Sequence, residues 1–312
     1  MVSRMPPPDS TPDLTVHDWG GPANAPALLL MHGLTDSGEC WADAVPRWTP
    51  RFRVLSWDAR GHGTSPRFTP EQLDRGVGET MADDAVAVLE WLAAQDITRP
   101  LLVGHSMGGG TAGVVAGRRP DLVRAVVLED PALGSDPAET EADRLRAGAG
   151  RVEDAQLWED DPAGAEAKGR AENPDWPEAE YAAWARSKRQ TDTAMLATGQ
   201  ARVLRSWLEV AAEVAVPALL LTCDDPLLWD DEGRAALVGL GNRLLQVERV
   251  AGAGHCIRRS RPDEFHGLVD AYLETHSSDP HSPSEHGPSE HGPIEHSPIE
   301  HGPGGAERAR PT

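Results

Sequence analysis

The sequence predicts an α/β protein: a mostly parallel central sheet flanked by helices, with a helical cap inserted between two of its strands. Short continuous apolar runs alternate with segments of helical periodicity, as is typical of strands buried on both faces and the helices that cover them. One stretch of about 80 residues breaks this alternation and offers no convincing strand. A strand and helix rhythm interrupted once favours a layered core with one insertion.

Six apolar runs are the expected strands of the sheet. They are PALLLMHG (26 to 33), RVLSWDARG (53 to 61), PLLVGHS (100 to 106), RAVVLEDP (124 to 131), PALLLTCDD (217 to 225) and RLLQVERV (243 to 250). Two intervening segments show helical spacing of apolar residues, one from Met81 to Leu92 and the other from Phe265 to Leu273.

Changes in composition divide the chain. We expect a flexible proline-rich leader at 1 to 13, a core formed by 14 to 133 and 214 to 276, and a cap at 134 to 213. From 277 to 312 the chain contains a five-residue repeat of the type HGPSE, with proline in every unit. Proline at this spacing prevents helix and sheet, so we expect the tail to be disordered or polyproline-like.

The net charge of -21 argues against binding nucleic acid or anionic membranes through broad electrostatics. No apolar run is long enough to span a membrane, and the first residues lack the apolar core of a signal peptide, so a cytoplasmic location is expected. Cys40, Cys223 and Cys256 have no metal-ligand spacing. We expect reduced thiols and no bound metal.

The motif GHSMGG (104 to 109) makes Ser106 the candidate nucleophile. It follows the apolar run PLLV and precedes a run of small residues that can begin a helix. A sharp turn from strand to helix presents its central residue, and Gly104 and Gly108 leave room for the chain to pass. Serine needs a neighbouring base, and His255, placed past the last strands, is the candidate.

With these motifs in place, the chain resembles the α/β-hydrolase family over about residues 14 to 276. The resemblance rests on His32-Gly33, the D-x-R-G-x-G-x-S stretch from Asp58 to Ser65, G-x-S-x-G, and G-x-G-H ending at His255. It implies a nucleophile, acid and histidine in that chain order, without a cofactor. It also implies that the backbone N–H groups of Leu34 and Met107 form the oxyanion hole.

The acid that would orient His255 is open among three aspartates. Asp225, at the end of PALLLTCDD, is favoured, although Thr222 stands where family members usually have glycine. Asp224 is the neighbouring alternative. Asp130, at the end of RAVVLEDP, is the third, because some relatives place their acid after the preceding strand.

Four aromatic residues are candidate contacts for the substrate. Trp41 follows the oxyanion loop, Trp158 and Trp184 lie in the cap, and His105 neighbours Ser106 but is expected to point away from it. A cap over the site predicts a mostly apolar pocket, which suits a small uncharged or hydrophobic acyl substrate. The sequence says nothing about the oligomeric state.

These residues favour a serine hydrolase that cleaves an ester, lactone or thioester through an acyl-enzyme. Carbon-carbon bond hydrolases, lyases and perhydrolase-like enzymes use the same residues and stay open as alternatives. Epoxide hydrolases and haloalkane dehalogenases are disfavoured, because they carry Asp at the position of Ser106. A non-catalytic ligand-binding protein on the same scaffold is the alternative of another class.

Overall fold

The computed structural model describes residues 2 to 4, 14 to 134, 139 to 224 and 228 to 277. Its strands are β1 (Val2–Arg4), β2 (Thr15–Gly20), β3 (Ala27–Met31), β4 (Arg53–Trp57), β5 (Leu101–His105), β6 (Val126–Glu129), β7 (Ala218–Thr222) and β8 (Leu245–Arg249). They form one sheet in the order β1-β2-β4-β3-β5-β6-β7-β8. Strands β3 to β8 run parallel, and β1 and β2 form an antiparallel edge.

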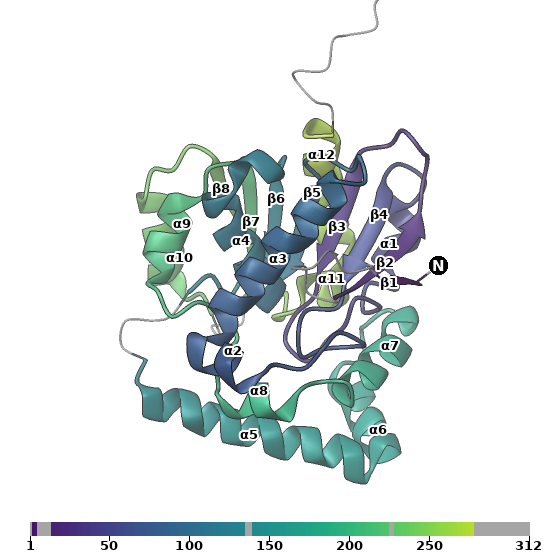
Figure 1. Ribbon diagram of the computed structural model, residues 1–312, viewed down its shortest axis with the longest axis vertical. Coiled ribbons are helices and arrows are strands. Elements are labelled where there is room, and N and C mark those ends of the chain that lie inside the picture. The colour runs from purple at the N-terminus through teal and green to yellow at the C-terminus, as the bar shows by residue number, and fades with distance from the viewer. Residues whose placement is uncertain (1, 5–13, 135–138, 225–227, 278–312) are drawn as a thin grey trace, which may run out of the picture. The chain divides into compact units, whose positions relative to one another are not determined.

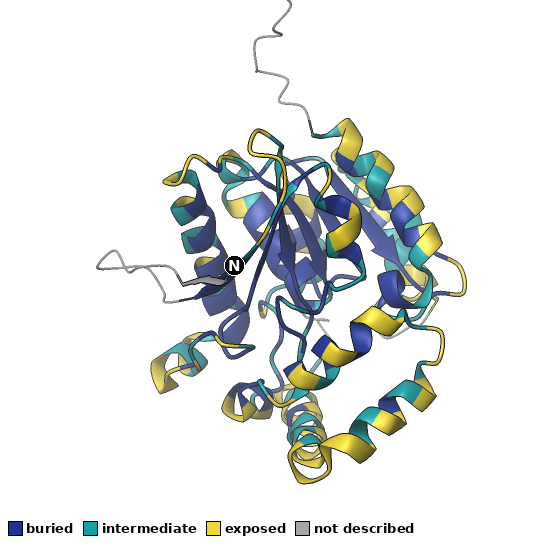
Figure 2. Cartoon of the chain, turned by 90° about the vertical axis from the view of Figure 1, so that its right-hand side faces the viewer, coloured by how far each residue is buried: buried dark blue, intermediate teal, exposed yellow. Residues whose placement is uncertain are grey.

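Helices cover both faces of the sheet (Figure 1). They are α1 (Ala44–Trp48), α2 (Pro70–Arg75), α3 (Val77–Ala93), α4 (Met107–Arg118), α5 (Glu141–Asp160), α6 (Pro162–Glu172), α7 (Glu178–Lys188), α8 (Thr193–Ala197), α9 (Trp207–Glu213), α10 (Asp231–Gly239), α11 (Ile257–Ser260) and α12 (Pro262–Thr275), with a short 3-10 helix at Pro120–Leu122. Strand residues alternate between two cores: one lies under α3, α4 and α9, and the other under α1, α11 and α12. Figure 2 shows the central strands as buried along their length.

The predicted α/β class is confirmed, and each of the six predicted strands coincides with one of β3 to β8. The two predicted helical segments lie within α3 and α12. The apolar runs of β3 to β7 have the expected cause, because these strands are covered on both faces, whereas β8 at the edge is partly exposed. Strand β2 was missed because its sequence, TVHDWG, contains no apolar run.

The leader was expected to be flexible, but the structure corrects this for residues 2 to 4. They form β1, which pairs with β2 in the register Val2 to His17. Residues 5 to 13 of the leader and the repeat-containing tail from 278 lie outside the described residues.

The insertion that follows β6 consists of helices in its described part. Helices α5 to α8 lie together below the core in Figure 1, whereas α9 lies beside α10 and packs on α4. The end of the segment expected to be cap therefore belongs to a core layer. Among the helices that the structure describes, none combines the length and the apolar character that crossing a membrane requires.

The turn after β4 fixes the loop that follows β3. The buried Asp58 carboxylate accepts hydrogen bonds from His17 Nε2 at 3.1 Å, Gly38 N at 2.8 Å and Thr64 N at 2.9 Å. Burial works against ionisation, but the bonds from His17 and these amides prevail and lower the pKa of Asp58 to about 2. The D-x-R-G-x-G-x-S motif thus ties β2 and the loop at Gly38 to the sheet.

Candidate active site

Ser106 lies at the junction between β5 and α4, in a backbone conformation that few residues other than glycine adopt. Its φ is 50° and its ψ is -112°. A Cβ at Gly104 would lie 2.5 Å from the carbonyl oxygen of Gly108, and a Cβ at Gly108 would lie 2.2 Å from that of Met31. Both glycines are required for this turn, which presents Ser106 at the carboxyl end of the sheet.

Ser106, His255 and Asp130 form a continuous chain of hydrogen bonds. His255 Nε2 lies 2.9 Å from Ser106 Oγ, and His255 Nδ1 lies 2.6 Å from Asp130 Oδ2. The Asp130 side chain is fully buried, and the His255 side chain is 27% exposed. The buried carboxylate fixes the imidazole with a proton on Nδ1, which leaves Nε2 free to accept the proton of Ser106.

The structure places Asp130 at His255, although the sequence favoured Asp225. Asp225 lies outside the described residues. Asp224 is directed elsewhere: its carboxylate accepts hydrogen bonds from Arg249 Nε and Gly252 N, both at 2.6 Å. Asp130 reaches His255 because it directly follows β6, and β6 lies next to β5 in the sheet. The end of β6 therefore opens beside Ser106. The Cys223 thiol also donates to Asp130 Oδ2 at 3.4 Å.

The family resemblance implied an oxyanion hole formed by the backbone N–H groups of Met107 and Leu34, and both residues lie near Ser106. Met107 is the first residue of α4, where helix geometry leaves the N–H without an intrahelical acceptor. Leu34 follows β3 and lines the same chamber as Ser106. The loop lies close to the turn, because a Cβ at Gly33 would be 3.5 Å from Ser106 Cβ. This arrangement suits stabilisation of an oxyanion.

His105 is buried beside His255 and lines the chamber, although it was expected to point away. The two ring centres are 4.9 Å apart, and His105 Nε2 donates to the backbone oxygen of His255 at 3.3 Å. Burial, and then the charges of His255 and Arg258, hold the pKa of His105 well below its usual range. A neutral His105 therefore supports the loop that carries His255.

The chamber in front of Ser106 has a volume of about 670 Å³. Trp176 and Trp184 contribute apolar surface, but charged side chains from both cap and core line it as well: Asp36, Glu139, Arg151, Lys188, Arg202 and Arg259. The sequence had indicated a mostly apolar pocket, because a cap was expected to cover the site. The lining is instead mixed.

Trp41 is not a wall of this chamber, and the prediction was wrong. Its side chain is fully buried in the core that faces α1 and α12, and the guanidinium of Arg258 lies 4.1 Å from its ring centre. Trp41 is therefore a core residue that packs against Arg258.

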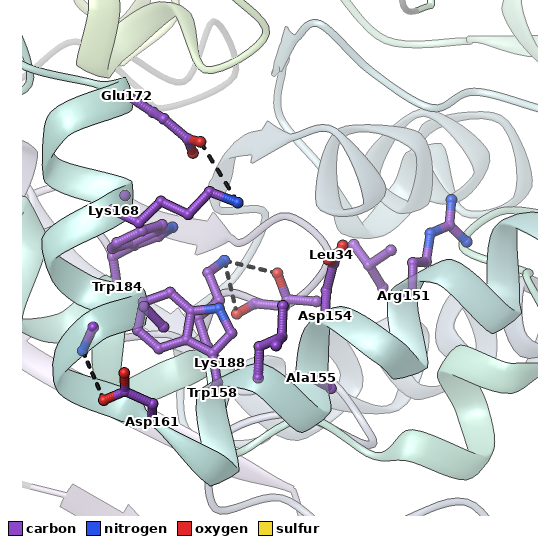
Figure 3. A pocket seen from close by; sticks show the side chains of 15 residues that line it. Leu34, Arg151, Asp154, Ala155, Trp158, Asp161, Lys168, Glu172, Trp184 and Lys188 are labelled. Atoms are coloured by element: carbon purple, nitrogen blue, oxygen red, sulfur yellow. Dashed lines mark hydrogen bonds and ion pairs between the residues drawn. The ribbon is translucent and has the colours of Figure 1, made fainter.

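Trp158 lines a second pocket, of about 580 Å³, between the cap helices (Figure 3). Its ring meets that of Trp184 edge to face at 5.2 Å. Four residues line both the second pocket and the chamber: Leu34, Arg151, Trp184 and Lys188. Trp184 is therefore shared between the two spaces, whereas Trp158 belongs to the outer one.

Buried ion pairs join the cap to the core behind the chamber. Arg259 donates to Asp36 Oδ2 at 3.0 Å and to Glu180 Oε2 at 2.7 Å. Lys188 Nζ lies 3.3 Å from Asp36 Oδ1. Burial opposes the ionisation of Asp36, but Arg259, Lys188 and Arg258 outweigh it and hold its pKa far below the usual range. These cations and acids neutralise one another.

One group of potential metal ligands occurs in the described part of the chain. Atoms of His105, Glu129 and Cys256 lie within 4.8 Å of one another. Arg258 already contacts two of these residues: its backbone N donates to Glu129 at 2.7 Å, and its Nη1 lies 2.9 Å from Cys256 Sγ. Burial raises the pKa of the Cys256 thiol to about 12. A guanidinium and a protonated thiol do not suit a cation site.

Sequence reasoning missed the charged residues of the chamber, above all Arg151 and Arg202. Among the charged residues of the chamber, the sequence distinguishes only Lys188, because it is one of just two lysines in the chain. The arginines of the cap are numerous, and nothing in their spacing separates those that face the chamber from those that face solvent.

Comparisons with known proteins agree with this geometry. Residues 28 to 268 match the model of the alpha/beta hydrolase family. Lipase LipV of Mycobacterium tuberculosis is 36% identical over 124 residues, which are 40% of this chain and 44% of the lipase. The 2-(acetamidomethylene)succinate hydrolase of Mesorhizobium japonicum is 31% identical over 140 residues, which are 44% of this chain and 47% of that enzyme. The matched part thus spans less than half of either relative.

A solved structure shows the same architecture over most of the chain. The crystal structure of an E-2-(acetamidomethylene)succinate hydrolase has a TM-score of 0.66 and 26% identity, and covers 84% of this chain and 95% of that one. The family model itself matches well over half of the chain. The chain therefore belongs to the alpha/beta hydrolase family.

Proposed function

We propose that the protein is a serine hydrolase that cleaves an ester, lactone or thioester through an acyl-enzyme on Ser106. The observation that carries the proposal is the hydrogen-bonded chain from Ser106 Oγ through His255 to the buried Asp130. Each member has the neighbour that its role requires: a base for the hydroxyl, and an acid for the base.

The reaction follows from these contacts. Ser106 Oγ attacks the carbonyl carbon while its proton passes to His255 Nε2, and Asp130 stabilises the imidazolium. The N–H groups of Leu34 and Met107 donate to the oxyanion of the tetrahedral intermediate. The bond from the carbonyl carbon to the leaving oxygen or sulfur then breaks, and His255 protonates that atom. Water attacks the acyl group, gives a proton to His255 and releases the acid with Ser106 restored.

A fluorophosphonate probe tests the proposal, because it labels only an activated serine. We expect the wild-type protein to be labelled, and mass spectrometry to place the adduct on Ser106. Ser106→Ala and His255→Gln should abolish labelling. His276→Gln is the matched control, because His276 caps the end of α12 through a bond to Tyr272 O.

A hydrolysis panel of p-nitrophenyl esters, lactones and thioesters measures the activity itself. Turnover that is lost in Ser106→Ala supports the hydrolase. A wild-type protein that neither reacts with the probe nor turns over any member of the panel would overturn the proposal and favour a ligand-binding protein. The expected uncharged or hydrophobic substrate stays a prediction.

A further inference from the structure

The cations that line the chamber fall into two groups. Lys188 and Arg259 each have an acidic partner in Asp36, and Arg259 has a second one in Glu180. Arg151 differs from them. Within the part of the chain that the structure describes, no carboxylate lies within ion-pair distance of its guanidinium, and its hydrogen bond goes to the backbone oxygen of Gly199 at 2.9 Å.

Arg202 lies on the same side of the chamber as Arg151 and is only partly satisfied. Its Nη2 donates to Glu139 Oε1 at 2.8 Å, while its buried Nε has no hydrogen-bond partner among the described residues. Glu139 is also shared with Arg144, whose Nη1 lies 3.8 Å from Oε2. Two guanidinium groups therefore share the Glu139 carboxylate while Arg151 has no carboxylate of its own, which leaves an excess of positive charge beside the chamber.

This excess is unfavourable in the absence of an anion. Burial, and then the charge of Arg202, lower the pKa of Arg151, and Glu139 offsets this only in part. Desolvated cations are normally paired or bound to a ligand. On a chain with a net charge of -21, an arginine without an acidic partner beside a second, only partly satisfied arginine is not explained by general composition.

The local structure holds Arg151 in place before any ligand arrives. Helix α5 packs against α8, and the acceptor Gly199 lies two residues after the end of α8. Gly199 has a φ of +68°, and a Cβ there would lie 1.8 Å from the oxygen of Arg144. In Figure 3, Arg151 lies at the end of the outer pocket away from Trp158 and Trp184. An anion at Arg151 would leave the tryptophans free for an apolar part of the same molecule.

We propose that Arg151 and Arg202 form an anion site that holds a carboxylate of the substrate, so that the enzyme prefers acyl compounds bearing a free carboxylate away from the scissile bond. The inference rests on the proposed function, because it places that bond at Ser106 in the same chamber. A guanidinium matches a planar carboxylate through paired N–H groups, and it can match a phosphate in the same way, so the test below compares the two anions.

The test compares two esters that differ only at the far end of the acyl chain. Mono-p-nitrophenyl adipate carries a carboxylate there, and p-nitrophenyl hexanoate carries a methyl group. We expect the wild-type kcat/KM to be at least about tenfold higher for the adipate. Arg151→Met should lower the ratio of the two kcat/KM values by about 10- to 100-fold, as expected for the loss of hydrogen bonds to a charged group.

Arg146→Met is the matched control. It lies on the same helix, but its side chain is 76% exposed and paired with Asp143. We expect the ratio to be unchanged in this variant. Circular dichroism and thermal unfolding of Arg151→Met establish that the chamber is still folded when the ratio is measured.

Binding to the Ser106→Ala protein separates this inference from the proposed function, because it needs no turnover. Calorimetry should show that adipate binds, that Arg151→Met in the same background weakens the binding at least about tenfold, and that inorganic phosphate does not compete. An unchanged ratio in Arg151→Met, or phosphate binding as tightly as adipate, would overturn the carboxylate site while the hydrolase stands. Adipate binding without any turnover or probe labelling would support the site and refute the hydrolase.

Discussion

Replacement of Asp130 by Asn removes the negative charge from a fully buried position and keeps the shape of the side chain. Asn is suited to the backbone there, because Asp130 has a φ of 38° and Asn tolerates positive φ. The 2.6 Å bond to His255 Nδ1 is charge-assisted, and its loss alone costs about 1.5 to 3 kcal/mol, or about 10- to 150-fold in rate. An amide that donates to the imidazole also stabilises the wrong tautomer, which raises the expected loss in kcat to about 10³- to 10⁴-fold.

The assay is steady-state hydrolysis of a p-nitrophenyl ester, with kcat and KM separated. KM should change little, because the charge on Asp130 acts chiefly when His255 becomes an imidazolium. Asp224→Asn is the control, and we expect at most about a tenfold loss, since its carboxylate contacts Arg249 and Gly252. If Asp130→Asn keeps more than a tenth of the activity, or if Asp225→Asn loses as much as Asp130→Asn does, the assignment of the acid is refuted.

Three further measurements check the physical account. Gly108→Ala should lower the free energy of unfolding by about 1 to 3 kcal/mol, because its Cβ would meet Met31 O, whereas Gly150→Ala, with open space around the new methyl group, should stabilise α5 slightly; equal effects in urea unfolding would contradict this. Burial lowers the pKa of His62 from 6.5 to about 3, so the unfolded state binds more protons between these values, and stability should fall by about 2 kcal/mol from pH 7 to pH 5; a His62→Asn variant with an unchanged pH slope would refute that cause. The Cys256 thiol, with a pKa raised to about 12 by burial, should resist alkylation at pH 8 until urea is added, as followed by mass spectrometry, and rapid modification of the native protein would show that the thiol is accessible.

The sequence predicted the parts of the fold that depend on local pattern. Strands β3 to β7 are largely apolar because each is covered on both faces, and this property is visible in the sequence, whereas β8 at the edge of the sheet is partly exposed. The turn at Ser106 was also visible in the sequence, because close backbone contacts require glycine at Gly104 and Gly108. Strand β2 was not predictable in this way, because it contains polar residues such as His17. The partner of His17 is Asp58, which lies in the turn after β4.

The acid and the chamber could not be predicted in this way. Asp130 and His255 are 125 positions apart, and their contact depends on the directions of two loops at the edge of the sheet. Arg151 looks like any other arginine on a polar helix, and only the packing of α5 on α8 turns it toward the chamber. Trp41 was misplaced because the sequence does not show that Arg258 would lie over its ring.

The ion pairs that link α7 to the core determine which part of the cap can move. Lifting α7 would separate the buried Glu180 from Arg259 and Lys188 from Asp36, at a cost of several kcal/mol, while the pair between Asp36 and Arg259 would stay in the core. Helices α5 and α6 are held more weakly, with Gly148 and Gly169 as their buried residues. Helix α7 is then the fixed part of the cap. We expect α5 and α6 to be the part that moves to admit substrate. Hydrogen exchange should therefore be faster along α5 and α6 than along α7.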